Sequence, residues 1–166
     1  MWDKADAIFN PPAGGWAKKK DLPSEWPVEI GGFKFNLSLS SFKHVGVFPE
    51  HRENWKWLGE KVASSQQQVA RKEKIKILNL FGYTGGATLA AAKVGAEVVH
   101  IDASKISVAK AKENAKLNGL EGAPIRWIVD DADKFVKREI TRGSKYDGII
   151  LDPPSFGRGV KGEVLK

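Results

Sequence analysis

The sequence predicts an α/β fold, in which a parallel sheet carries helices on both faces and follows an N-terminal loop and β-hairpin. Three observations predict the sheet. From Ile75 onward, short apolar runs alternate with helix-like runs. The apolar runs, such as Val98-Val99 and Ile149-Ile150-Leu151, are typical of parallel strands buried on both faces. The helix-like runs stop at glycines, which readily end helices.

The elements follow in the order β-α-β-α-β-α-β, which predicts right-handed crossovers. Strands are predicted over residues 75–80, 97–101, 125–129 and 146–151, and helices over residues 86–94, 104–117 and 132–141. The glycine stops are Gly95, Asn118-Gly119 and Gly143.

The region before the sheet differs in composition. Residues 1–27 are rich in proline and glycine and predict a loop. Three tryptophans within it (Trp2, Trp16, Trp26) indicate that it packs against another part of the protein. Two alternating runs then flank Gly31-Gly32 and predict a β-hairpin over residues 28–37.

A helix is predicted from Pro49 to about residue 72, because a proline and acidic residues stand in its first turn. Trp55, Leu58 and Val62 fall on one stripe of it. We therefore predict an N-terminal extension over residues 1–48 and a core over residues 49–166.

Composition and charge limit the function classes. The chain has 166 residues and no cysteine, which excludes disulfides, thiolate metal sites and a cysteine nucleophile within it. Its three histidines show no metal-ligand spacing. No apolar run is long enough for a membrane helix, and no signal peptide is evident, so we expect a cytoplasmic protein without metal or membrane contact. The net charge of +7 favours a polyanionic partner, although spread lysines are also typical of solvated helix faces.

The turn between the first sheet strand and its helix is rich in glycine. It runs over Asn79, Leu80, Phe81, Gly82, Tyr83, Thr84, Gly85 and Gly86. Glycine lets the backbone approach a ligand closely, and such a turn cradles a cofactor in open α/β sheets. The alternative is a simple strand-to-helix connection. The spacing of its glycines argues against a dinucleotide-dependent oxidoreductase.

Carboxylates follow the next strands. Asp102 ends the second strand about 20 residues beyond the turn, where a ribose-binding carboxylate is expected. Asp130-Asp131 follow the third strand. For Asp102 and Asp131 the alternative is capping of the next helix, a role that Ser104 can take in place of Asp102.

The fourth strand ends in Asp152-Pro153-Pro154-Ser155-Phe156. The prolines fix the backbone and expose carbonyl acceptors, which suits an exocyclic amine as the reacting group, and Phe156 is placed to stack on a base. The alternative is a rigid turn with a core phenylalanine.

Together, the turn, Asp102 and Asp152-Pro153-Pro154 resemble the Rossmann-like core of class I S-adenosylmethionine (SAM) methyltransferases. The segment from Phe42 to Trp55 narrows the resemblance to the bacterial subfamily related to 23S ribosomal RNA large-subunit methyltransferases. In that group a Gly-x-x-x-(Asp/Glu)-x-Arg element precedes the core, here Gly46, Glu50 and Arg52.

The resemblance implies a SAM-dependent methyltransferase that acts on nucleic acid, with ribosomal RNA as the expected partner. The family sheet has more strands than the chain holds, so we expect a piece of a longer protein. The alternative is a non-catalytic fragment that binds cofactor or RNA. The implied cofactor-binding residues are Asn79, Phe81, Gly82, Tyr83, Thr84, Gly85, Gly86, Asp102, Ala103, Ser104, Asp131, Ala132 and Arg52. Among them, Asp131 is expected to accept from the adenine amine, with the backbone of Ala132 beside it. The implied catalytic residues are Asp152, Pro153 and Pro154.

Overall fold

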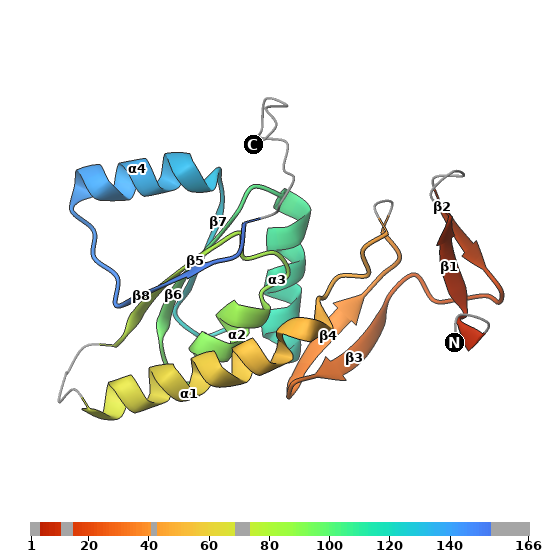
Figure 1. Cartoon of the computed structure of the whole chain (residues 1–166), viewed down its shortest axis with the longest axis horizontal. Coiled ribbons are helices and arrows are strands. Elements are labelled where there is room, and N and C mark those ends of the chain that lie inside the picture. The colour runs from red at the N-terminus through yellow and green to blue at the C-terminus, as the bar shows by residue number, and fades with distance from the viewer. Residues whose placement is uncertain (1–3, 11–14, 41–42, 69–73, 154–166) are drawn as a thin grey trace.

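The computed structural model describes residues 4–10, 15–40, 43–68 and 74–153 (Figure 1). Its elements in chain order are β1 (Ala7–Asn10), β2 (Gly15–Lys18), β3 (Trp26–Ile30), β4 (Phe33–Leu37), η2 (Pro49–His51), α1 (Arg52–Gln68), β5 (Lys76–Leu80), α2 (Gly86–Lys93), β6 (Glu97–Asp102), α3 (Lys105–Leu117), β7 (Ile125–Val129), α4 (Ala132–Arg142) and β8 (Gly148–Leu151).

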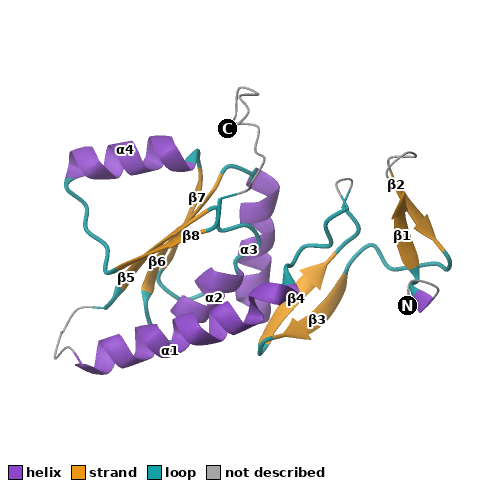
Figure 2. Ribbon diagram, viewed as in Figure 1, coloured by secondary structure: helices purple, strands orange, loops and turns teal. Residues whose placement is uncertain are grey.

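A parallel sheet of four strands, in the order β7-β6-β5-β8, forms the centre of the protein (Figure 2). The first strand of the sheet, β5, lies between β6 and β8. The chain therefore runs outward from β5 to β7 and then returns to β8 on the other side of β5. This order confirms the predicted Rossmann-like α/β fold.

Helices cover both faces of the sheet because successive strand residues point to opposite sides. Ile77 packs in one core cluster with Val62 of α1 and Ala91 of α2. Leu78, its neighbour in β5, packs in another cluster with Phe135 of α4. The predicted stripe of α1 is buried in two clusters, since Val62 lies in the first one, Trp55 lies in the cluster of the hairpin, and Leu58 packs against both.

The hairpin β3–β4 shares a core with the helices. Phe33, Phe35 and Leu37 are buried in one cluster with Trp55 of α1 and Leu89 of α2. The Phe35 and Trp55 rings lie 5.3 Å apart. The hairpin is thus held against the sheet domain by hydrophobic burial, while the division at residue 48 stays a prediction.

The predicted loop over residues 1–27 is wrong in part. β1 and β2 form a separate antiparallel pair there, and β3 begins at Trp26. Phe9 and Trp16, opposite each other across β1 and β2, make an edge-on ring contact at 5.4 Å. Trp16 also donates from Nε1 to the Ser40 carbonyl at 2.6 Å, which confirms that this tryptophan packs on another part of the chain. Trp2 lies outside the described residues.

The predicted helix over residues 49–72 begins with a 3-10 turn, η2, and continues as α1 to Gln68. Residues 69–73 lie outside the described residues. The last strand is shorter than predicted, since β8 begins at Gly148 and Tyr146 packs instead beside the α4 cluster. β3 begins two residues before the predicted start of the hairpin, and at the other strands and helices the observed ends differ from the predicted ones by one residue or not at all.

Candidate functional site

The carboxyl ends of β5, β6, β7 and β8 meet at one edge of the sheet, as parallel pairing requires. Ligands bind outside this edge in open α/β sheets. A cavity of about 600 Å³ lies between α1 and the strands β5 and β8, and it reaches this edge at the glycine-rich turn and Asp152. It is lined by many of the predicted site residues, namely Asn79, Phe81, Gly82, Tyr83, Thr84, Gly85, Gly86 and Asp152.

The backbone of the turn has an unusual conformation. Phe81 and Tyr83 have φ angles of 57° and 48°, in the left-handed region that only a few per cent of non-glycine residues adopt. Gly85 has φ 95°. Such conformations cluster at ligand sites, where the surrounding structure enforces them. This observation argues against a plain strand-to-helix connection.

Two glycines of the turn are required for a reason that the sequence did not reveal. A Cβ at Gly82 would lie 2.5 Å from the His100 ring, and a Cβ at Gly86 would lie 2.4 Å from the Trp55 ring. These glycines therefore admit buried aromatic side chains beneath the turn. Both glycines also line the cavity, and the close approach of the turn to a ligand stays a prediction.

Contacts from two other segments hold the middle of the turn. Thr84 donates from Oγ1 to the Gly46 carbonyl at 2.7 Å, and its own carbonyl accepts from the buried Asn114 amide at 2.9 Å. The oxygen of the same Asn114 amide accepts from the backbone of Asn36 in β4. One side chain of α3 thus links the hairpin to the turn.

The Gly46–Arg52 element is only partly brought to the turn. Gly46 touches Thr84, whereas Arg52 lies on a different hollow, beside Gly31, and its Nε is 3.3 Å from Glu53. Glu50 is exposed. The structure thus does not bring Arg52 together with the other predicted cofactor residues.

Asp102 sits where the sequence predicted a ribose-binding carboxylate. One carboxylate oxygen accepts from the Tyr83 backbone N–H at 2.8 Å, and the other accepts from the Ser104 N–H at 2.8 Å. The N-cap of α3 is Ser104, whose hydroxyl accepts from the Ser107 N–H. Each carboxylate oxygen has a second lone pair, so Asp102 is oriented and keeps acceptor capacity. Ala103 between them is exposed.

Asp131 has the capping role that was the alternative. Its side chain accepts from the Lys134 N–H at 2.9 Å and caps α4. Ala132, the first residue of α4, is buried in the cluster beneath the helix. Neither residue lines the cavity at α1, and Asp102 and Ser104 do not line it either. These residues lie instead at the neighbouring strand ends.

Asn79 belongs to a buried polar network beneath the turn. It is 2% exposed and donates to Thr88 Oγ1 at 2.8 Å, and the same hydroxyl lies 2.9 Å from His100 Nδ1. Trp127 covers His100 with ring centroids 4.9 Å apart. Burial lowers the pKa of His100 to about 4, so this imidazole is neutral at pH 7. The network positions the turn from below.

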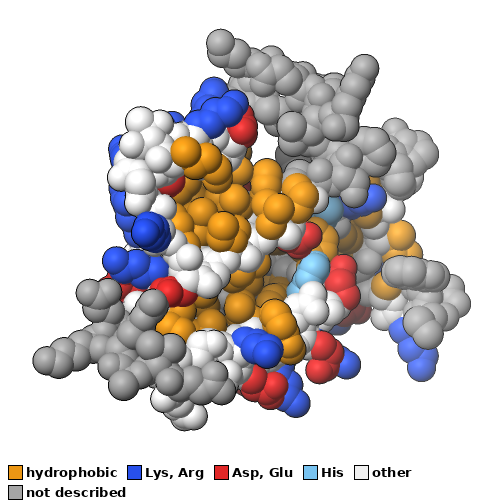
Figure 3. All heavy atoms as spheres, turned by 60° about the vertical axis from the view of Figure 1, so that its left-hand side comes forward, with side chains coloured by type: hydrophobic (Ala, Val, Ile, Leu, Met, Phe, Trp, Pro, Cys, Tyr) orange, Lys and Arg blue, Asp and Glu red, His pale blue; other side chains and the backbone are white. Residues whose placement is uncertain are grey.

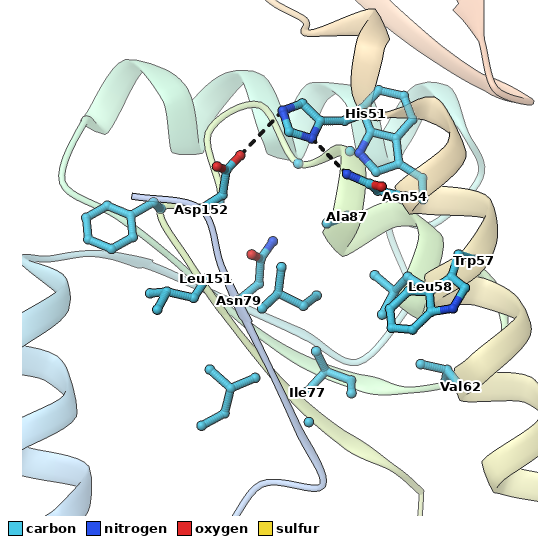
Figure 4. A pocket seen from close by; sticks show the side chains of 18 of the residues that line it. His51, Asn54, Trp57, Leu58, Val62, Ile77, Asn79, Ala87, Leu151 and Asp152 are labelled. Carbon is cyan, nitrogen blue, oxygen red and sulfur yellow. Dashed lines mark hydrogen bonds and ion pairs between the residues drawn. The ribbon is translucent and has the colours of Figure 1, made fainter. Parts of the chain in front are cut away.

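Asp152 faces a residue that sequence reasoning missed. His51, on η2, places Nε2 3.5 Å from Asp152 Oδ2 (Figure 4). No local pattern announced this pair, because the two residues lie far apart in the chain. Pro153 is exposed next to Asp152. Pro154 and Phe156 lie outside the described residues.

The start of α2 differs electrostatically from the other helix starts at this edge. Ser104 caps α3 and Asp131 caps α4, whereas the N-cap of α2 is Gly85, and no side chain caps this helix. Uncapped N–H groups and the helix dipole favour an anionic group at this point. The start of α2 opens on the cavity, since Gly86 and Ala87 line it.

Within the described ranges, no three His, Cys, Asp or Glu side chains are grouped so that they would hold a metal ion. No helix of the described residues is long and apolar enough to cross a membrane.

Known proteins resemble this chain in sequence. It is 37% identical over 152 residues to "Ribosomal RNA large subunit methyltransferase K/L" of Shewanella frigidimarina, which aligns 91% of this chain with 20% of the relative. It is 34% identical to "Ribosomal RNA large subunit methyltransferase I" of Aeromonas salmonicida, over 78% of this chain and 30% of the relative. The chain therefore spans less than a third of the length of these two curated relatives.

Solved structures agree with the sequence relatives. A SAM-dependent methyltransferase from Agrobacterium tumefaciens superimposes with a TM-score of 0.87 at 50% identity, over 99% of this chain and 52% of that chain. A protein described as a methyltransferase and complexed with SAH superimposes with a TM-score of 0.74 at 27% identity, over 90% of this chain and 37% of that chain. The family model of S-adenosylmethionine-dependent methyltransferases matches residues 9–164. The chain belongs to this family of SAM-dependent methyltransferases.

Proposed function

We propose that this chain forms the cofactor-binding part of an enzyme that transfers a methyl group from SAM to nucleic acid, with ribosomal RNA as the substrate. One observation carries the proposal. The glycine-rich turn and Asp152 line the same cavity at the carboxyl edge of the sheet. A cofactor held by the turn and a substrate group held at Asp152 therefore meet in one space.

The residues of the site fit the parts of SAM. The uncapped start of α2 suits its carboxylate, and Asp102 suits its ribose hydroxyls. When bound, SAM supplies an electrophilic methyl group. The protein contributes mainly by orienting the two reactants and excluding water.

The acceptor end of the site suits an exocyclic amine. Asp152 is exposed at the cavity and offers carboxylate oxygens, which only accept hydrogen bonds when ionised. An amine N–H needs such an acceptor while its nitrogen lone pair faces the methyl group. The net charge of +7 favours a polyanion, and the two sequence relatives described above are named as ribosomal RNA methyltransferases. An RNA of the ribosome would place the chain in the cytoplasm.

Replacing Asp102 tests the ribose assignment. Asp102→Ala is expected to weaken SAM binding at least about tenfold, since it removes hydrogen bonds to a charged acceptor. Isothermal calorimetry on the 166-residue chain measures the dissociation constant. Asp133→Ala, the same change at an exposed position of α4, is the control. Equal affinities of the two variants would exclude Asp102 from the cofactor site.

Asp131 offers a test that separates helix capping from cofactor binding. Asp131→Ser keeps an oxygen at the N-cap of α4, so the free energy of unfolding should stay within about 0.5 kcal/mol of wild type. If the carboxylate also accepts from the adenine amine, SAM binding weakens about tenfold. Calorimetry and urea unfolding of the same sample give both values. Unchanged SAM affinity would leave Asp131 a capping residue alone.

A further inference from the structure

His51 lies at the edge of the cavity between two polar side chains (Figure 4). Its Nε2 is 3.5 Å from Asp152 Oδ2, and its Nδ1 is 3.3 Å from Asn54 Nδ2. His51 and Asn54 are three residues apart where η2 runs into α1, so both side chains point to the same side. The histidine is about one-third exposed, with its side chain at 35%.

The two neighbours fix the position of the imidazole proton. An amide nitrogen only donates, so Nδ1 of the neutral ring accepts from Asn54. The proton of the neutral ring then resides on Nε2, which faces Asp152. An ionised carboxylate only accepts, so the Nε2–H donor and Asp152 are complementary. In the opposite tautomer both contacts would be mismatched.

The separation from Asp152 is longer than a formed hydrogen bond. Such contacts in ligand-free sites are often long and tighten when the substrate complex forms. Phe48 limits the movement of the ring, since it lies edge-on to His51 at 6.3 Å and makes a tilted ring contact at 5.3 Å with Tyr83 of the turn. The histidine is therefore held between the turn and the start of α1.

We propose that His51 is a positioning residue for Asp152, and that Asn54 sets the tautomer needed for this role. The Nε2–H group holds one carboxylate oxygen, and the remaining acceptor sites of the carboxylate face the amine to be methylated. The inference rests on the proposed function, because it gives Asp152 the task of orienting the acceptor amine.

The first test determines which ring nitrogen of His51 carries the proton, and it needs no substrate. The full chain has three histidines, so long-range ¹H–¹⁵N spectra of histidine-labelled protein at neutral pH can be assigned by single substitutions. Wild-type His51 is expected as the Nε2–H tautomer, and Asn54→Ala is expected to shift it toward a mixture. A wild-type ring protonated on Nδ1 would overturn the inference.

The second test measures the rate of methyl transfer. Tritiated SAM at saturating concentration and protein-free ribosomal RNA are incubated with wild type and with variants at His51. His51→Ala is expected to lower the transfer rate about tenfold, while SAM affinity by calorimetry stays within about twofold. His51→Gln should restore most of the rate, since its amide offers one donor to Asp152 and one acceptor to Asn54.

His44→Ala is the matched control. This histidine lies 5.5 Å from the Phe48 ring, and its removal should leave the rate as in wild type. An active wild type with an equally active His51→Ala would overturn the inference alone. These rates are measured with the longer protein that contains this chain; if that protein binds SAM and methylates no RNA, the proposed function is overturned, and the role of His51 with it.

Discussion

Gly82→Ala is expected to lower the free energy of unfolding by about 3 kcal/mol. The new methyl group would lie 2.5 Å from two atoms of the His100 ring, a distance that real contacts do not show. His100 cannot yield easily, because it is fully buried between Thr88 and the Trp127 ring. Either the ring or the turn must shift, and a shifted turn should also weaken SAM binding. Urea unfolding and calorimetry measure the two effects.

Gly122→Ala is the control for this substitution. Nothing lies within 4 Å of a Cβ at Gly122, and its φ is not in the left-handed region. This variant should match wild type or exceed its stability slightly, because alanine loses less backbone entropy on folding. If Gly82→Ala is as stable as Gly122→Ala, the close packing of His100 under the turn is disproved.

The chain is expected to lose about 3 kcal/mol of stability as pH falls from 6.5 to 4, because His100 is buried in its neutral form. The unfolded chain protonates this imidazole below about pH 6.5, whereas burial lowers its pKa in the folded state to about 4. The contribution is therefore fully present above pH 6.5 and is lost as pH falls toward 4. Urea unfolding at several pH values across this window measures the slope.

His100→Gln separates this effect from other titrations. The variant should be less stable at pH 7 but should depend less on pH between 6.5 and 4. Glu139 affects stability in a lower pH range, since a hydrogen bond from Tyr146 lowers the pKa of its carboxyl to about 2. Stability from Glu139 is present above its ordinary pKa of 4.5 and is lost below it. Parallel pH profiles for wild type and His100→Gln would contradict the assignment to His100.

An exposed apolar surface accompanies the site. Ile149 and Leu151 of β8 are 64% and 62% exposed, and Trp57 of α1 is 60% exposed. Figure 3 shows the side of the protein that lies to the left in Figure 1. Hydrophobic side chains gather on it. In β8, Ile149 and Leu151 pair with the buried Leu78 and Leu80 and so point to the same face of the sheet as these leucines. Apolar residues of parallel strands are usually buried, whereas these two are exposed.

Several features followed from the sequence by itself. The parallel sheet and the order of its elements were predictable, because apolar runs and glycine stops are patterns among residues close together in the chain. The position of Asp102 was predictable too, since residues that end parallel strands gather at one edge. The cap at Ser104 and the stop at Gly143, which has φ 66°, depend only on neighbouring backbone.

The short pair β1–β2 was missed because its strands have four residues each. So few residues show too little alternation to outweigh the nearby prolines and glycines. Its formation rests on the contact between Phe9 and Trp16 and on the bond from Trp16 to Ser40. Neither contact has a local signature.

Only the tertiary structure decided which side chains meet at the site. It placed His100 under Gly82, Trp55 under Gly86 and His51 opposite Asp152. It also turned Arg52 toward another hollow. The physical reason is the same for all of these pairs. Residues distant in the chain become neighbours through the packing of helices on the sheet, and the sequence carries no period that encodes such a distance.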